Sequence, residues 1–226
     1  MFCKLCDATA IMASMNYDIL GVIATLAGLV LGLALHEFAH AWVGHYLGDT
    51  TARDQGRLTL NPLAHIDVFT TLLLPIFLMI AHLPVFAAAR PVPFNPWALR
   101  GGRWGAAAVA AAGPFTNLLI ALFCSVWLRV VAGSSPAAFV VLGSIIAVNC
   151  GLFVFNLIPI PPLDGSRVLY AIAPPALREA MDNLERAGLV VIFGIVLLLS
   201  YTPVGSLLSQ TIRGLTALLL PTSILP

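Results

Sequence analysis

Two histidines and a glutamate inside an apolar stretch are the residues of this chain best suited to chemistry. His36, Glu37 and His40 form an HExxH motif within an apolar run over residues 19–43. On a helix, histidines four positions apart project from one face and can bind a single Zn²⁺. A glutamate beside the first histidine can then act as base toward a metal-bound water. Because charge in hydrocarbon is costly, ionisable residues in such a run indicate a functional site.

The alternative is a structural pair of buried histidines that bond to the backbone or to each other. An HExxH motif arises by chance in roughly one of 700 chains of this length and composition, so chance explains it poorly. A structural pair would also leave the neighbouring glutamate in need of a partner in lipid. The motif therefore favours a metal site.

A catalytic zinc needs a third protein ligand, and Asp164 is the candidate. It is the only carboxylate between Asp67 and Glu179, and it follows a proline-rich break at residues 156–163 that must end regular helix. Non-helical backbone at membrane depth is tolerated only where it lines a site or is buried in protein. The alternative is that Asp164 belongs to an Asp-Gly turn.

The composition is that of a membrane protein. The chain is 60% hydrophobic and only 9% charged, whereas about a quarter of the residues in soluble domains are charged. We expect an all-α polytopic membrane protein with roughly four to six transmembrane helices, forming one domain over residues 1–226. The net charge of +1 argues against a nucleic-acid partner.

Apart from the HExxH run, the candidate helices are residues 104–131 and 137–157 and a C-terminal pair, 188–200 and 205–220. Each half of the pair is short for a span, so a tilted hairpin or peripheral helices are expected. One row on the first helix repeats every four residues and places small side chains above and below the histidines: Ala24, Gly28, Gly32, His36, His40 and Gly44. Small residues at this spacing let another helix approach closely, which predicts that the histidine face looks inward.

Two further segments are expected to depart from a simple span. Residues 68–89 are apolar but contain Pro75 and Pro84, and arginines on both flanks would straddle the membrane against the positive-inside bias if the segment crossed. We therefore expect a re-entrant segment. Residues 90–96 are too rich in proline for helix, and an extended segment near the active site is expected.

Three motifs in this order resemble the site-2 protease family of intramembrane zinc metalloproteases (peptidase M50). They are the HExxH motif, Gly-Pro-Phe-Thr-Asn at residues 113–117 and the proline-rich stretch at 156–165. The resemblance extends from residue 24 to about 169, within a core of residues 19–169. Residues 56–67 and 90–96 further resemble the compact prokaryotic branch, which has neither PDZ nor CBS domains, although residues 68–70 depart from its usual proline and glycine.

The resemblance implies one Zn²⁺ per chain, held by His36, His40 and Asp164. It implies that Glu37 is the general base and proton shuttle, and that Asn117 steadies the oxyanion or the substrate strand.

Four other residues are candidates for substrate binding. Asn149 and Asn156, seven positions apart, either face the site or cap backbone groups near the proline break. Pro93 and Asn95 belong to the extended segment, which either pairs with an unwound substrate strand by β-augmentation or is a simple connector.

The expected function is hydrolysis of peptide bonds within or near transmembrane segments, either in regulated intramembrane proteolysis or in clearance of signal-peptide remnants. The expected partners are a transmembrane protein or peptide substrate and the lipid bilayer, and the resemblance places the chain as a multi-pass protein in a prokaryotic cell membrane. The alternatives are a catalytically silent relative that binds membrane proteins, and a metal or ion transporter. Intact Glu37 argues against the first, and the scarcity of other intramembrane carboxylates or histidines argues against the second.

Overall fold

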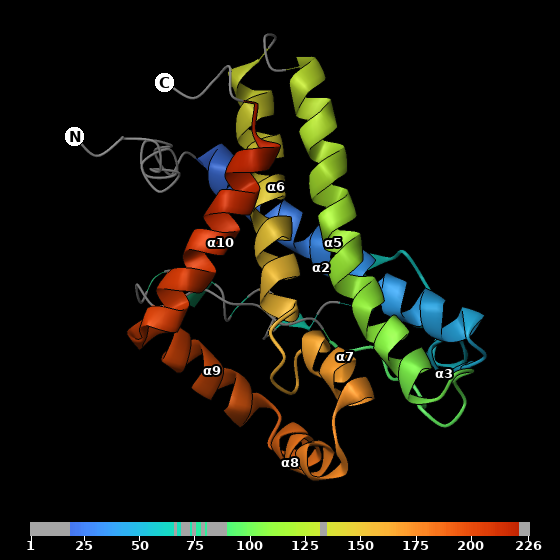
Figure 1. Cartoon of the computed structure of the whole chain (residues 1–226). Coiled ribbons are helices and arrows are strands. Elements are labelled where there is room, and N and C mark those ends of the chain that lie inside the picture. Colours follow the sequence, from blue (N-terminus) through green and yellow to red (C-terminus); the bar gives the residue numbers. More distant parts are fainter. Residues whose placement is uncertain are drawn as a thin grey trace.

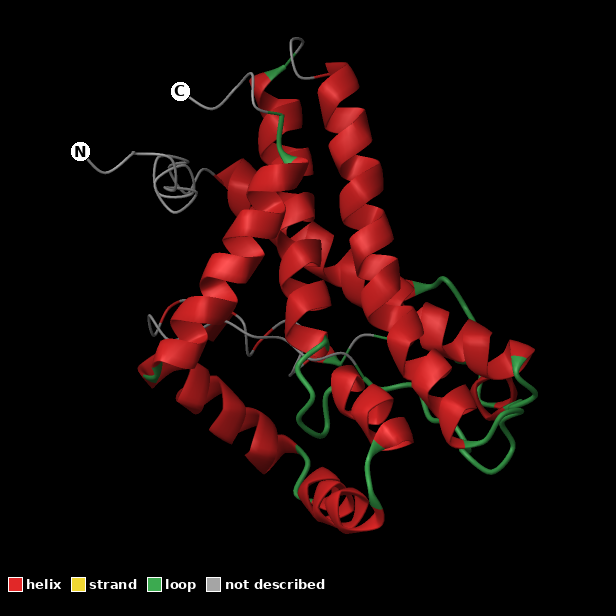
Figure 2. Cartoon of the chain, in the orientation of Figure 1, coloured by secondary structure: helices red, strands yellow, loops and turns green. Residues whose placement is uncertain are grey.

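The structure is a computed structural model, and in its described part the chain is all-helical without strands, as Figure 2 shows. The all-α prediction is thereby confirmed. The structure describes residues 19–65, 67, 68, 73, 76, 77, 80, 90–131 and 135–221. The expected re-entrant segment at 68–89 falls almost entirely outside these residues and stays a prediction.

In the described part of the chain, three helices are long and apolar enough to cross a membrane: α2 (Ile19–Tyr46), α5 (Arg103–Val131) and α6 (Pro136–Asn156). A fourth span is possible if the bent pair of α8 (Pro175–Arg186) and α9 (Leu189–Tyr201) counts as one. In chain order the elements are α2 (Ile19–Tyr46), α3 (Thr51–Asp54), the 3₁₀ turn η1 (Pro62–Ala64), α5 (Arg103–Val131), α6 (Pro136–Asn156), α7 (Asp164–Ile172), α8 (Pro175–Arg186), α9 (Leu189–Tyr201) and α10 (Pro203–Leu219).

The helices α2, α5 and α6 pack against one another and form the centre of the molecule, with α2 crossing behind the other two in the view of Figure 1. The predicted inward row on α2 is confirmed, because Ala24, Gly28, Gly32, His36 and Gly44 are all buried. A Cβ on Gly28 would lie only 3.2 Å from the Cα of Ile145 in α6. Small residues therefore set the close approach of α2 and α6.

The proline-rich stretch after α6 brings α7 back to the centre. The helix α6 ends at Asn156, and α7 begins at Asp164 and packs against α5. Gly165, in the first turn of α7, lies so close to the carbonyl of Leu157 that a side chain there would collide with it. The alternative in which Asp164 and Gly165 form only a turn does not match this structure, because both residues are helical.

The C-terminal pair is confirmed as two helices, α9 and α10, with Thr202 between them; α10 packs against α6. The helix α8 is not among the helices expected from the sequence. Its signal was present, because Pro175 stands at the first helical position and Leu177, Met181 and Leu184 recur at helical spacing on an otherwise polar segment. Of these only Met181 is buried.

We predict that Gly28→Leu lowers the melting temperature of the detergent-solubilised protein, because the added side chain must push α2 away from Ile145. Overpacking of this kind costs about 1–3 kcal/mol. Gly21→Leu is the matched control on the same helix, since a Cβ there meets nothing nearer than 3.9 Å. Equal melting temperatures for the two variants would show that the α2–α6 contact does not depend on a small residue.

Candidate metal centre

Three side-chain atoms from two helices converge at the centre of the molecule. His36 Nε2 lies 3.0 Å from His40 Nε2, and Asp164 Oδ2 lies 3.0 Å from the first and 3.4 Å from the second. The two histidines come from one face of α2, and the aspartate comes from the start of α7. The sequence predicted this triad of residues, and the structure brings all three together as a group that could hold a metal ion.

The outer nitrogens of both rings face protein acceptors. His40 Nδ1 lies 2.7 Å from the carbonyl oxygen of Val109, and His36 Nδ1 lies 2.7 Å from Asn117 Oδ1. The amide nitrogen of Asn117 donates to the carbonyl of Gly32 and to Asn149 Oδ1, which fixes the orientation of the amide. Both Nδ1 atoms therefore carry a ring hydrogen, and once each Nε2 is deprotonated, as metal binding requires, its lone pair faces Asp164.

The electron-rich atoms of this triad fit a cation. Two Nε2 atoms and a carboxylate oxygen, each able to bind a metal ion, lie within 3.4 Å of one another. A tetrahedral zinc with bonds of about 2.0–2.1 Å would hold its ligand atoms roughly 3.3 Å apart, close to the separations found here. Two imidazoles and one carboxylate also form a ligand set that suits zinc and leaves a coordination position open.

Gly113 in α5 keeps the space in front of the ligand atoms clear. A Cβ at this position would lie 2.5 Å from His40 Nε2 and 2.6 Å from His36 Nε2. The helix continues through the following Pro114, and both residues are buried. The Gly-Pro pair of the second sequence motif thus places a helix without a side chain directly against the imidazoles.

Glu37 is buried beside the triad with an exposure of 8%, and its Oε2 accepts a 2.8 Å hydrogen bond from the backbone N–H of Val92. Val92 belongs to residues 90–95, which are non-helical and lie along α2. The expectation of an extended segment near the site agrees with this part of the structure. One carboxylate oxygen of Glu37 is therefore tied to that segment.

Comparison with known proteins identifies relatives with a named activity. A protein of Bacillus subtilis named "Putative zinc metalloprotease YwhC" is 37% identical over 186 residues, which cover 79% of this chain and 80% of that protein. Proteins named "Putative zinc metalloprotease Rip2" from Mycobacterium tuberculosis and Mycolicibacterium smegmatis are 30% and 29% identical, and the matches cover 68% and 67% of their lengths. This chain belongs to the zinc metalloprotease family of YwhC and Rip2. No family model and no solved structure matches it.

In this zinc metalloprotease the residues predicted to contact substrate lie in different surroundings. Asn117 and Asn149 are fully buried, and Asn149 also donates to the carbonyl of Ile145. Their contacts give both amides a positioning role behind His36, and a contact of Asn117 with the oxyanion stays a prediction that these contacts do not favour. Asn156 donates to the carbonyl of Leu152 at the end of α6, and its contact with substrate stays a prediction.

The predicted substrate-binding residues of the extended segment lie nearer the surface. Pro93 is half-buried and Asn95 is exposed. The N–H of Asn95 donates to Asp49 Oδ2 at 2.6 Å, and its Oδ1 accepts from Trp97 N. Asn95 therefore has a structural role in this metalloprotease in addition to any contact with substrate.

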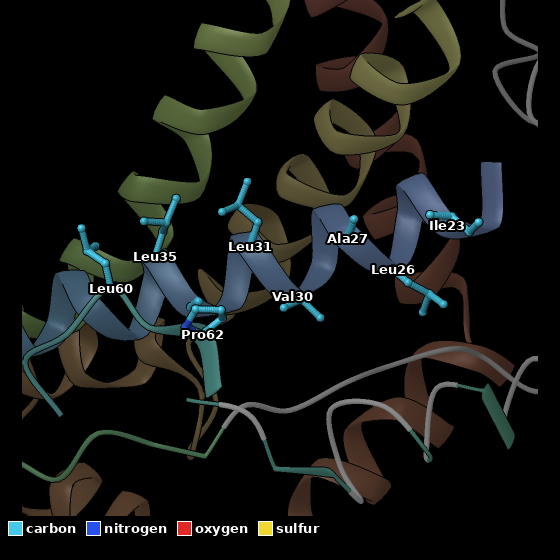
Figure 3. Close-up of a pocket in the computed structure, with 9 residues that line it drawn as sticks. Ile23, Leu26, Ala27, Val30, Leu31, Leu35, Leu60 and Pro62 are labelled. Carbon is cyan, nitrogen blue, oxygen red and sulfur yellow. The ribbon is translucent and has the colours of Figure 1, made fainter. Parts of the chain in front are cut away.

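Two of the larger cavities among the described residues of this metalloprotease lie away from the triad. One, of about 460 Å³, is an apolar groove along α2 where Leu60 and Pro62 face the helix (Figure 3). The other, of about 500 Å³, lies between Phe94, the start of α5 and the helices α7 and α8. Arg167 crosses its wall, with the guanidinium 4.7 Å from the centre of the Phe94 ring and an ion pair to Glu185.

We predict that Gly113→Ala lowers the metal content of the purified metalloprotease, because the new methyl group would occupy the space directly in front of both imidazoles. The measurement is zinc per chain by atomic emission after dialysis. Gly151→Ala is the control, since a Cβ on this α6 glycine meets nothing within 4 Å. Undiminished zinc in Gly113→Ala would contradict the close packing of α5 on the ligands.

Proposed function

We propose that this chain is an intramembrane zinc endopeptidase of the site-2 protease type, with one Zn²⁺ per chain bound by His36, His40 and Asp164. The observation that carries the proposal is the convergence of these three ligand atoms on one face of α2, a helix long and apolar enough to span a membrane. Such a place suits cleavage of a peptide bond within the bilayer. The relatives' names support the zinc and the protease activity.

The residues divide the chemistry among them. Bound zinc would lower the pKa of its water and polarise the substrate carbonyl. Glu37 would accept the proton of the attacking water and donate a proton to the nitrogen of the departing amine. Asn117 and Val109 hold the Nδ1 hydrogens of the two histidines, so that the rings keep their tautomer and orientation throughout the cycle.

The proposed substrate is a transmembrane segment of a membrane protein, or a signal-peptide remnant. Its scissile carbonyl is shielded by the helical i to i+4 hydrogen bond, so the segment must unwind locally before attack. Residues 90–95 lie next to Glu37, and the N–H groups of Val92 and Asn95 are already bonded within the chain. Pairing of an unwound substrate strand by β-augmentation would therefore use the remaining backbone groups of this segment. The bacterial relatives and the apolar helices support a multi-pass protein of the bacterial cell membrane, and the proposed place in the compact branch without PDZ or CBS domains rests on the sequence resemblance alone.

We predict that Glu37→Gln retains zinc and the fold but loses peptide-bond cleavage, since an amide can neither accept nor return the proton. The assay is cleavage of a model transmembrane peptide in detergent or liposomes, with zinc content measured on the same sample. Glu179→Gln, an exposed glutamate on α8, is the matched control and should cleave normally. Turnover of Glu37→Gln near that of the wild type would remove Glu37 from the mechanism.

We predict that Asp164→Asn loses zinc and proteolysis together, because a neutral amide oxygen is a poorer zinc ligand than a carboxylate. The change keeps the size of the side chain and remains compatible with the start of α7. Asp54→Asn, at the exposed end of α3, controls for the loss of one negative charge. Full zinc occupancy and activity in Asp164→Asn would end its assignment as a ligand.

A further inference from the structure

We propose that Arg57 is a positioning residue for Glu37, which it holds through a single peptide group, and that Asp49 secures the far end of the segment to which this peptide belongs. The proposal rests on the proposed role of Glu37 as the base. Neither Arg57 nor Asp49 touches the metal ligands in the described contacts, and the HExxH motif alone gives no sign of them.

The peptide that joins Pro91 to Val92 bridges a buried cation and a buried anion. Arg57 Nη2 donates to the carbonyl oxygen of Pro91 at 3.2 Å, and the N–H of Val92 donates to Glu37 Oε2 at 2.8 Å. The C=O and N–H of this one planar unit point in opposite directions. The orientation of the peptide plane therefore decides whether the N–H reaches the carboxylate.

Arg57 is well suited to fix that plane. Its exposure is only 8%, and Nη2 also donates to the preceding carbonyl, that of Arg90, at 2.8 Å. Within the described part of the chain it forms no ion pair, so the buried guanidinium is compensated by backbone carbonyls rather than by a carboxylate. A cation at the carbonyl end polarises the peptide and strengthens its N–H as a donor. Arg57 thereby strengthens the hydrogen bond from Val92 N–H to Glu37 without touching Glu37.

The sequence leaves Val92 alone in this role. Residues 91–93 read Pro-Val-Pro, and proline has no N–H, so Val92 carries the only backbone donor of the three. Its side chain is buried against Ala41 of α2 and Ala52 of α3, with Leu58 packed beside them. Packing sets the position of Val92, and Arg57 sets the orientation of its peptide.

Asp49 fastens the other end of the segment to the end of α2. The Asp49 side chain is 2% exposed, and its Oδ2 accepts from Asn95 N at 2.6 Å while Oδ1 accepts from the amide and hydroxyl of Thr51. Burial raises the pKa of the Asp49 carboxyl, but these hydrogen bonds outweigh burial and leave the pKa below its usual value. Asp49 is therefore ionised at neutral pH and remains a strong acceptor for the N–H of Asn95.

The decisive test compares Val92→Pro with Val92→Ala. Proline deletes the N–H that binds Glu37 and places its ring Cδ where that hydrogen points, so Glu37 Oε2 must move away from the segment. Alanine keeps the N–H and loses packing. We expect Val92→Pro to lower kcat by about 10–100-fold with unchanged KM for a model transmembrane peptide, unchanged zinc per chain and a melting temperature no lower than that of Val92→Ala. Val92→Ala should lose much less kcat than Val92→Pro.

The arginine is tested in parallel. Arg57→Ala should lower kcat as Val92→Pro does, Arg57→Lys should recover part of the loss because it keeps a cationic donor, and the double variant Arg57→Ala/Val92→Pro should be no slower than the slower single variant. Arg53→Ala is the control and should match the wild type, because Arg53 is an exposed arginine of α3, four positions before Arg57. If Arg57→Ala does not fold, Arg57→Lys and Val92→Pro decide.

Two results would overturn the proposal. The first is wild-type kcat in Val92→Pro. The second is a fall in zinc content, or a melting temperature below that of Val92→Ala, that accompanies the fall in kcat, because it would make the role merely structural. Failure of the proposed function looks different, since the wild type would then not cleave the peptide, and failure of the base assignment would show as normal cleavage by Glu37→Gln. An inactive Glu37→Gln beside a fully active Val92→Pro would remove the positioning role alone.

Discussion

The convergence of three unshielded acceptor atoms in an apolar interior is the constraint on which the rest of this structure depends. His36, His40 and Asp164 bring two ring nitrogens and a carboxylate oxygen to within 3.4 Å of one another. These electron-rich atoms repel one another unless a metal ion or a proton lies between them. Holding them together requires exact tautomers, a helix without a side chain in front, and a chain that returns from the proline break to the depth of the histidines. Asn117, Gly113 and the start of α7 meet these three requirements in turn.

A second layer of polar contacts links the three central helices at this centre and connects the centre to the segment outside them. One chain of hydrogen bonds runs inward from Asn149 through Asn117 to His36 and ties α6 and α5 to α2. The other runs from Arg57 through the Pro91–Val92 peptide to Glu37. The first orients a ligand and the second orients the proposed base. The proposed metal binding and the proposed proton transfer are thus positioned by separate parts of the molecule. Variants are therefore expected to affect one without the other.

Local pattern was sufficient to predict the parts of this account that depend on spacing. The four-residue period of α2 predicted both the pair of histidines and the inward direction of their face, and the scarcity of carboxylates singled out Asp164. Contacts between distant segments could not be predicted. Arg57 reaches Pro91 across 34 residues and Asn117 reaches His36 across 81, and nothing in either local sequence specifies the partner. The amphipathic period of α8 was readable, but the surrounding proline-rich and polar residues concealed it.

The central claim is that two imidazoles and one carboxylate form the protein part of a zinc site. Zinc K-edge X-ray absorption on the detergent-purified chain tests it most directly, because sulfur, imidazole and oxygen ligands give distinct scattering. The account predicts two imidazole nitrogens at about 2.0–2.1 Å and otherwise only oxygen ligands. Cys124 and Cys150 are buried in a separate apolar cluster and should not contribute. A sulfur shell near 2.3 Å, or a spectrum with fewer than two imidazoles, would contradict the account.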